Sequence, residues 1–185
     1  MIRTVALAIA CTVALAAIAG CTATASDAPD NKPAIAQSPS SDSELVARGE
    51  YMVRMGGCND CHTPGWNDSA GQMPTAQWLT GSPLGNLGPW GTTYPANLRL
   101  KIASMDEQAW LAYSGNLHTR PLMPDFALRA MHEDDRRAIY RFIHSLGPAG
   151  QPAPAYLPPG QKPPAPYLEL VLPPAPSPAP PPAAH

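Results

Sequence analysis

Apolar residues recur at helical intervals in two stretches of the chain that lie far apart, one near residue 45 and one near residue 140. The first stretch is preceded by Ser41 and Glu44, which have the spacing of a capping box, and is followed by two glycines. It predicts a helix that begins near Ser41 or Ser43. Gly49 lies inside this helix and lowers its stability, which suggests that another helix approaches closely there.

The second stretch predicts a last helix over residues 133–146. Three acidic residues stand in its first turn, where negative charge suits the helix dipole, and Gly147-Pro148 ends it. Its expected buried stripe consists of Ile139, Phe142, Ile143 and Leu146.

The region between these helices contains loops and one shorter helix. Residues 63–100 hold five prolines and frequent glycines without a long periodic run, which predicts loops. Ser104 and Glu107 again have capping-box spacing and predict a short helix that ends near Gly115. Its expected apolar side consists of Ala109, Trp110 and Tyr113. The aromatic packing groups of the loop region are Trp66, Trp78, Trp90 and Tyr94.

Composition separates this helical domain, placed at residues 44–148, from what precedes it. Residues 1–20 have the features of an export signal, with Arg3 before an uncharged apolar run at 5–19. The sequence Ile18-Ala19-Gly20-Cys21 resembles the bacterial lipobox, which would make Cys21 the acylated first residue of the mature protein. The alternative is an ordinary signal peptide in which Cys21 is incidental. Residues 21–43 are rich in alanine, serine and proline and predict a flexible tether.

The chain after residue 148 is dominated by proline. Fifteen of the 25 prolines follow Leu146, a composition that favours extended polyproline II structure. Residues 173–185 are expected to be a disordered tail. The apolar groups at 156–157 and 167–172 predict that the rest of the segment 149–185 lies along the domain as an extended arm.

Charge and motif content exclude several function classes. The formal net charge of −2 gives no basic signature for binding nucleic acid or anionic lipid. The apolar run of the leader is too short for a comfortable membrane-spanning helix, and that of the tail is far too short. The sequence also contains no paired-carboxylate site, phosphate loop or catalytic triad that would specify a substrate.

The strongest chemical signal is the run Cys58-Asn59-Asp60-Cys61-His62. Two cysteines three apart, followed directly by histidine, are the attachment signature of c-type haem: each thiol adds to one vinyl group and the imidazole binds iron. The alternatives are a thioredoxin-like redox motif, half of a zinc site and a structural disulfide. The adjacent histidine and the exported context favour haem, and the remaining cysteines, Cys11 and Cys21, lie in the leader region.

A second iron ligand is predicted at Met123. Pro121 and Pro124 stiffen the backbone on both sides of Leu122-Met123, and a weak thioether ligand needs a rigid loop. The rivals for this position are Met73, Met105, Met131, His118 and His132, and an open or water-filled site is the remaining alternative.

With these motifs in order, residues 44–148 resemble a monohaem class I cytochrome c of bacterial type. The resemblance implies an all-α fold, a small helical domain wrapped around one covalent haem c. It implies that Cys58 and Cys61 hold the haem and that His62 and Met123 bind the iron. It also implies contact between Gly49 and Phe142 or Tyr140, and a proline carbonyl, with Pro74 the best-placed candidate, that accepts the other ring proton of His62. The segment 86–97 resembles loops of cytochromes that accompany periplasmic dehydrogenases, and His132 takes the place of a threonine usual in the family.

The function expected from this resemblance is a lipid-anchored one-electron carrier on the periplasmic side of a Gram-negative membrane, without a substrate of its own. It would accept electrons from a dehydrogenase or respiratory complex, which includes the role of a dehydrogenase subunit, and pass them to an oxidase or another cytochrome. The alternative is a haem enzyme or gas sensor with an open distal site. A third interpretation makes the haem structural and the proline-rich arm a partner-binding module.

Overall fold

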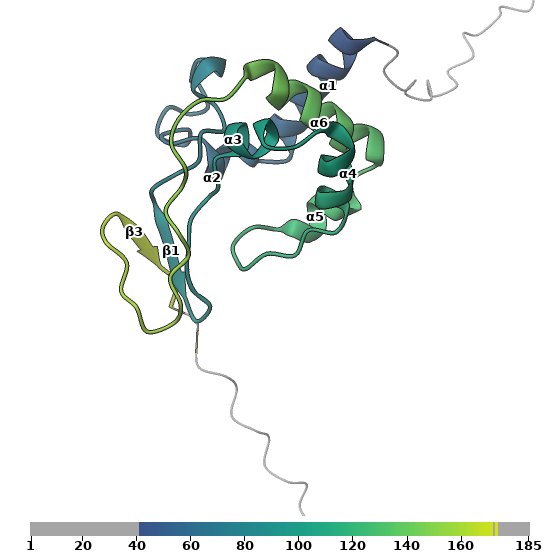
Figure 1. Cartoon of the computed structure of the whole chain (residues 1–185). Coiled ribbons are helices and arrows are strands. Elements are labelled where there is room, and N and C mark those ends of the chain that lie inside the picture. Colours follow the sequence, from purple (N-terminus) through teal and green to yellow (C-terminus); the bar gives the residue numbers. More distant parts are fainter. Residues whose placement is uncertain (1–40, 172, 174–185) are drawn as a thin grey trace, which may run out of the picture. The chain divides into compact units, whose positions relative to one another are not determined.

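The computed structural model describes residues 41–171 and 173 (Figure 1). The leader, Cys21, nearly all of the tether and the end of the tail lie outside the described residues. Helices dominate the described part, as predicted, and a small sheet that was not predicted accompanies them. The helices are α1 (Asp42–Met55), α2 (Cys58–His62), α3 (Leu98–Ala103), α4 (Glu107–Gly115), α5 (Asp125–Ala130) and α6 (Glu133–Leu146), with a 3₁₀ turn at Thr75–Gln77. The strands are β1 (Gly85–Gly88), β2 (Gly91–Thr93) and β3 (Tyr167–Glu169).

The pairing of α1 with α6 is the main helix contact of the fold. Ser41 caps α1 as predicted: its hydroxyl accepts the Glu44 N–H at 3.2 Å, and the Glu44 carboxylate accepts the Ser41 N–H at 2.9 Å. A Cβ on Gly49 would lie 2.0 Å from the Ala138 carbonyl oxygen and 2.6 Å from Phe142 Cβ. The predicted close helix approach at Gly49 is therefore confirmed, because only glycine lets the two backbones meet there.

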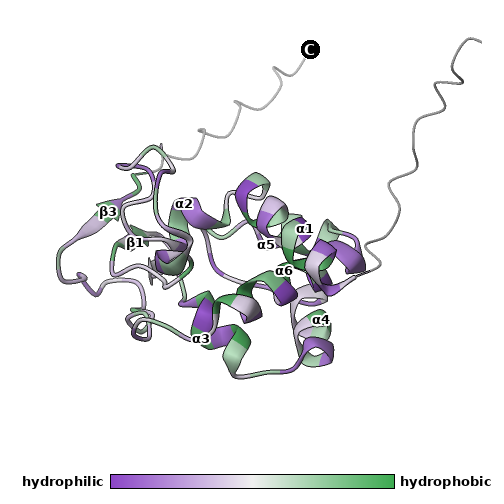
Figure 2. Ribbon diagram, turned by 90° about the horizontal axis from the view of Figure 1, so that it is seen from above, coloured by the Kyte–Doolittle hydropathy of each residue, from purple (hydrophilic) through white to green (hydrophobic). Residues whose placement is uncertain are grey.

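The last helix has the predicted bounds and buries the predicted stripe. Ile139, Phe142 and Ile143 are buried, whereas Leu146 is partly exposed. Hydrophobic and hydrophilic residues alternate along the α6 ribbon, as expected for a helix with one face in the core (Figure 2).

The core contains two of the four tryptophans. Trp78 is fully buried, with its ring edge-on to Trp66 at 5.1 Å and to Phe142 at 6.0 Å between centroids. Its indole N–H donates to the Met73 carbonyl at 2.9 Å, so this polar atom is satisfied inside the core. The other buried core residues include Val53, Leu79, Ile102, Trp110, Ile139 and Ile143.

The predicted start of the short helix that ends near Gly115 was wrong. Ser104 ends α3, a short helix that was expected to be loop, and Asp106 is the cap of α4, accepting the Ala109 N–H at 2.8 Å. An aspartate two residues later is an equally good cap and carries the charge that suits a helix N-terminus. The end at Gly115 is as predicted. Of the three residues expected on its apolar side, Trp110 is buried, whereas Ala109 and Tyr113 are exposed.

Helix α5 was also not predicted. It begins immediately after Pro124, where the missing N–H of proline does no harm because the first helical N–H groups have no intrahelical partner. Its Leu128 reaches the core.

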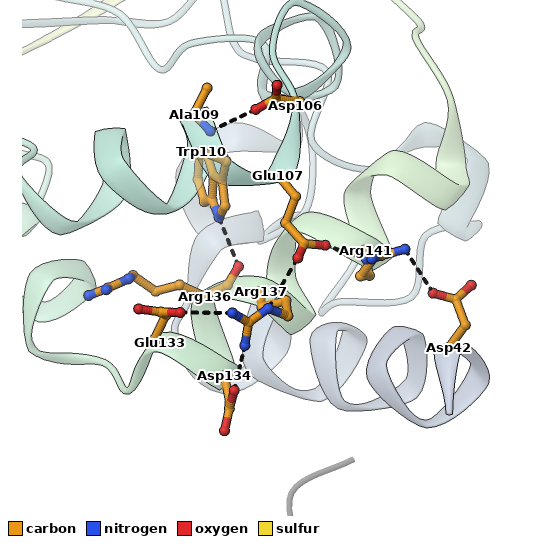
Figure 3. A network of polar contacts seen from close by, with 10 residues as sticks. All are labelled: Asp42, Asp106, Glu107, Ala109, Trp110, Glu133, Asp134, Arg136, Arg137 and Arg141. Carbon is orange, nitrogen blue, oxygen red and sulfur yellow. Dashed lines mark hydrogen bonds and ion pairs between the residues drawn. The ribbon is translucent and has the colours of Figure 1, made fainter. Parts of the chain in front are cut away.

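An ion-pair network joins α1, α4 and α6 (Figure 3). Glu107 of α4 accepts from Arg137 at 3.1 Å and also from Arg141, which reaches Asp42 of α1 at 3.2 Å. Arg137 additionally pairs with Glu133 and Asp134. The charges are partly solvated, so each pair contributes little by itself, but the network links the first turns of α1 and α4 to α6.

The sheet has the strand order β2-β1-β3. β1 and β2 form an antiparallel hairpin with Asn86 opposite Thr93, and β3 runs parallel to β1 with Leu168 opposite Asn86. The segment after α6 thus contributes the third strand. Within the described residues, no helix is long and apolar enough to cross a membrane.

Candidate functional site

The Cys-x-x-Cys-His run forms a single helical turn directly after α1. Gly57 stands between the two helices with φ of 65°, the left-handed conformation that glycine adopts at least cost. The turn leaves the Cys58 side chain half-buried and Cys61 exposed, and it places His62 at its end with 8% of its surface exposed.

Both thiols are free, and their environment does not suit a reactive dithiol. Burial raises the pKa of Cys58 to about 11, and burial followed by the nearby Asp60 carboxylate raises the pKa of Cys61. Thioredoxin-like cysteines need the opposite shift, because the thiolate is the nucleophile. Among the described residues, no three His, Cys, Asp or Glu side chains gather in a way that could hold a metal ion.

The imidazole of His62 is oriented by a backbone carbonyl. Its Nδ1 lies 2.7 Å from the carbonyl oxygen of Ala96. With the proton on Nδ1, the ring donates to this carbonyl and Nε2 keeps a free lone pair, the form that binds a metal. Burial lowers the pKa of His62, while the Ala96 carbonyl raises it, so burial favours the neutral ring.

The prediction that the Pro74 carbonyl accepts the ring proton of His62 was wrong. The Pro74 carbonyl accepts the Gln77 N–H at 2.9 Å and starts the 3₁₀ turn. Ala96 reaches His62 because two backbone bonds hold its segment there: the Gly81 N–H donates to the His62 carbonyl at 2.8 Å, and the Leu98 N–H donates to the Leu79 carbonyl at 2.9 Å.

Two buried polar residues support this turn and were not predicted from the sequence. Thr63 donates to the Asn59 side-chain oxygen at 2.6 Å and accepts the Leu79 N–H at 2.8 Å. Both Thr63 and Asn59 are almost fully buried. They tie the end of α2 to the segment that runs beside it, so they hold His62 in place indirectly.

Met123 lies on a separate loop between α4 and α5 and is 37% exposed. The hydroxyl of Thr93 donates to the Pro121 carbonyl at 2.8 Å and attaches this loop to β2. Of the rival residues, Met73, Met105 and Met131 pack partly buried against the hydrophobic core, while His118 and His132 are exposed.

The donor groups of this region fit a haem c. Two unpaired thiols stand one helical turn apart, an oriented imidazole with a free Nε2 follows the second, and a thioether stands on a loop between prolines. The two thiols and the imidazole are the groups that haem c uses for covalent attachment and for one iron ligand, and a methionine thioether is a residue type that can supply the other.

Comparisons with known proteins agree with this chemistry. The chain is 32% identical over 130 residues to two proteins named "Alcohol dehydrogenase (quinone), cytochrome c subunit", one from Gluconacetobacter polyoxogenes and one from Komagataeibacter europaeus. The match covers 64% of this chain and only 26% of the length of each relative. No protein-family model and no solved structure matches the chain.

Proposed function

We propose that the chain is a c-type cytochrome, a one-electron carrier with a single covalent haem c, anchored to a membrane on the periplasmic side of a Gram-negative bacterium. Cys58 and Cys61 would form the two thioether bonds, and His62 and Met123 would bind the iron. A single haem is proposed because the sequence contains one Cys-x-x-Cys-His motif.

The observation that carries this proposal is the bond between His62 Nδ1 and the Ala96 carbonyl at 2.7 Å. It fixes the ring orientation and the position of the ring proton, so that Nε2 is available before any ligand binds. A carbonyl acceptor also raises the donor strength of the imidazole.

Met123 is proposed as the second ligand because its loop is restrained. Prolines flank the Leu122-Met123 pair, and Thr93 attaches Pro121 to the sheet. Haem c would supply a one-electron couple, and with His62 and Met123 as its iron ligands its potential would be raised and no position would be left for a substrate. The chain would therefore carry electrons and not transform a molecule itself.

A dehydrogenase is the proposed electron donor. The relatives are named as the cytochrome c subunits of a quinone alcohol dehydrogenase, and this chain spans about a quarter of their length. We infer that it takes the electron-accepting part of such an assembly, as a subunit or as a separate carrier, and passes electrons to an oxidase or to another cytochrome.

The membrane anchor is proposed at Cys21. The support is the sequence Ile18-Ala19-Gly20-Cys21, and the residue itself lies outside the described part of the chain. Several acyl chains on Cys21 would hold the protein stably, since a single chain gives only marginal binding. A Cys21→Ser variant should move the protein from the membrane fraction to the soluble fraction, and an unchanged distribution would refute the anchor.

The ferric absorption spectrum of the purified protein tests the proposed ligation. The wild type should show the weak far-red charge-transfer band of sulfur bound to ferric iron, and Met123→Ala should lack it. The reduced wild type should resist carbon monoxide, whereas the reduced variant should bind it. A wild type without the band that takes up carbon monoxide readily would favour a haem enzyme or gas sensor with an open site.

A further inference from the structure

The chain after α6 does not leave the domain but returns across the sheet. We call residues 149–171 the strap. Its Leu157 exchanges two backbone hydrogen bonds with Thr92, at 2.8 and 3.1 Å. A Cβ on Gly91 would lie 2.2 Å from the Leu157 carbonyl oxygen, so the strap and β2 are in close backbone contact. Main-chain contacts therefore hold the strap against β2. Further along the strap, β3 pairs with β1.

The residue before this contact reaches the loop that carries Met123. The hydroxyl of Tyr156 donates to the Trp90 carbonyl at 2.9 Å, and its ring lies 3.9 Å from the Arg120 guanidinium. Arg120 stands three residues before Met123. Its neighbour Pro121 is held by the Thr93 hydroxyl at 2.8 Å. The strap and β2 therefore contact two consecutive residues of the loop.

The ends of the same loop are held by contacts within the loop and with α5. Arg129 donates to Asp125 at 2.7 Å and to the Leu117 carbonyl, and Asp125 accepts the Thr119 N–H. These contacts close the base of the loop. The part of the loop around Leu122 and Met123 then lies between restrained residues, and the restraints that come from distant parts of the chain are those of the strap and of β2.

We propose that the strap braces the Met123 loop, with Tyr156 and Arg120 as its positioning residues. The proposal rests on the proposed role of Met123 as an iron ligand. A thioether is a weak ligand, so the fraction of time it stays bound depends on how far its loop can move away. An exposed cation–π contact is expected to shift the balance between attached and detached loop by about two- to fivefold.

The test is displacement of Met123 by imidazole in the ferric full-length protein, followed in the far-red band. At saturating imidazole the rate reports how often the loop detaches. Tyr156→Leu and Arg120→Gln should each raise this rate by about two- to fivefold. The displacement rate of the double variant should not appreciably exceed that of either single variant, because both substitutions remove the same contact between the Tyr156 ring and Arg120. Tyr156→Phe keeps the ring over which Arg120 lies and should raise the rate less than Tyr156→Leu.

A matched control is Tyr51→Leu, which removes an exposed tyrosine ring beside Arg48, 5.4 Å away on α1, without touching the loop. Its rate should equal that of the wild type. If Tyr156→Leu and Arg120→Gln also leave the rate unchanged while Met123→Ala abolishes the band, the brace is refuted and the ligation stands. If the wild type lacks the far-red band, Met123 does not bind the iron. The proposed role of the strap is then refuted as well.

Discussion

Replacing Gly49 by alanine should separate α1 from α6 and destabilise the domain. The added Cβ would lie 2.0 Å from the Ala138 carbonyl oxygen, and the obstacle is backbone that cannot rotate away. Overpacking of this kind costs about 1–3 kcal/mol, with rigid contacts at the upper end. The gain in helix propensity returns about 1 kcal/mol, which leaves a net loss of about 2 kcal/mol.

Thermal unfolding of the purified protein, followed by far-ultraviolet circular dichroism, measures this loss. A decrease in Tm of roughly 6–10 °C is expected for a domain of this size. Gly115→Ala is the matched control, because its Cβ would meet only the end of the flexible Arg136 side chain at 3.4 Å. That variant should be near the wild type. A Gly49→Ala protein as stable as the wild type would show that the helices are not in backbone contact there.

Three further changes test other parts of the fold in urea unfolding. Thr63→Val leaves the buried Leu79 N–H without an acceptor and should cost about 1–3 kcal/mol, whereas Thr63→Ser should recover most of it. Arg99→Met removes a buried guanidinium that donates to the Ala76, Leu146 and Gly147 carbonyls, and should cost about 2–4 kcal/mol; no change in midpoint would contradict these contacts. Glu107→Gln breaks the ion pairs with its two arginine partners and should cost about 1 kcal/mol at low salt, with a smaller difference at high salt.

The first and last helices could be predicted because their signals are local. Ser41 and Glu44 mark the start of α1, and three acidic residues mark the start of α6. The apolar stripe that includes Phe142 shows the helical period of α6. The short helices were harder. Ser104 and Asp106 offer two overlapping cap positions, and the choice depends on where α3 ends. A proline before residue 125 suggested the end of regular structure, although it equally suits a helix start.

The sheet could not be predicted because its partners are distant in sequence. The residues of β1 are Gly85-Asn86-Leu87-Gly88, which have low strand propensity, and their pairing with Tyr167–Glu169 becomes apparent only in three dimensions.

The haem motif was evident from residue types, but its supporting atoms were not. Cys58, Cys61 and His62 have side chains whose chemistry can be recognised in a sequence. The acceptor for His62 is the main-chain oxygen of Ala96, and any residue could provide it. The resemblance to class I cytochromes c pointed to the Pro74 carbonyl for that role, because a proline usually provides it in the family. Thr63 and Asn59 gave no signal beyond being polar and close to the motif.

Mass spectrometry of the tryptic peptide 55–99 tests the central claim most directly. This peptide contains Cys58, Cys61 and His62 and no internal cleavage site. The account predicts that the peptide from the exported protein carries the mass of one haem through two thioether bonds, and that the double variant Cys58→Ser, Cys61→Ser carries none. An unmodified peptide, or one with a Cys58–Cys61 disulfide, from cells that mature other c-type cytochromes would contradict the account.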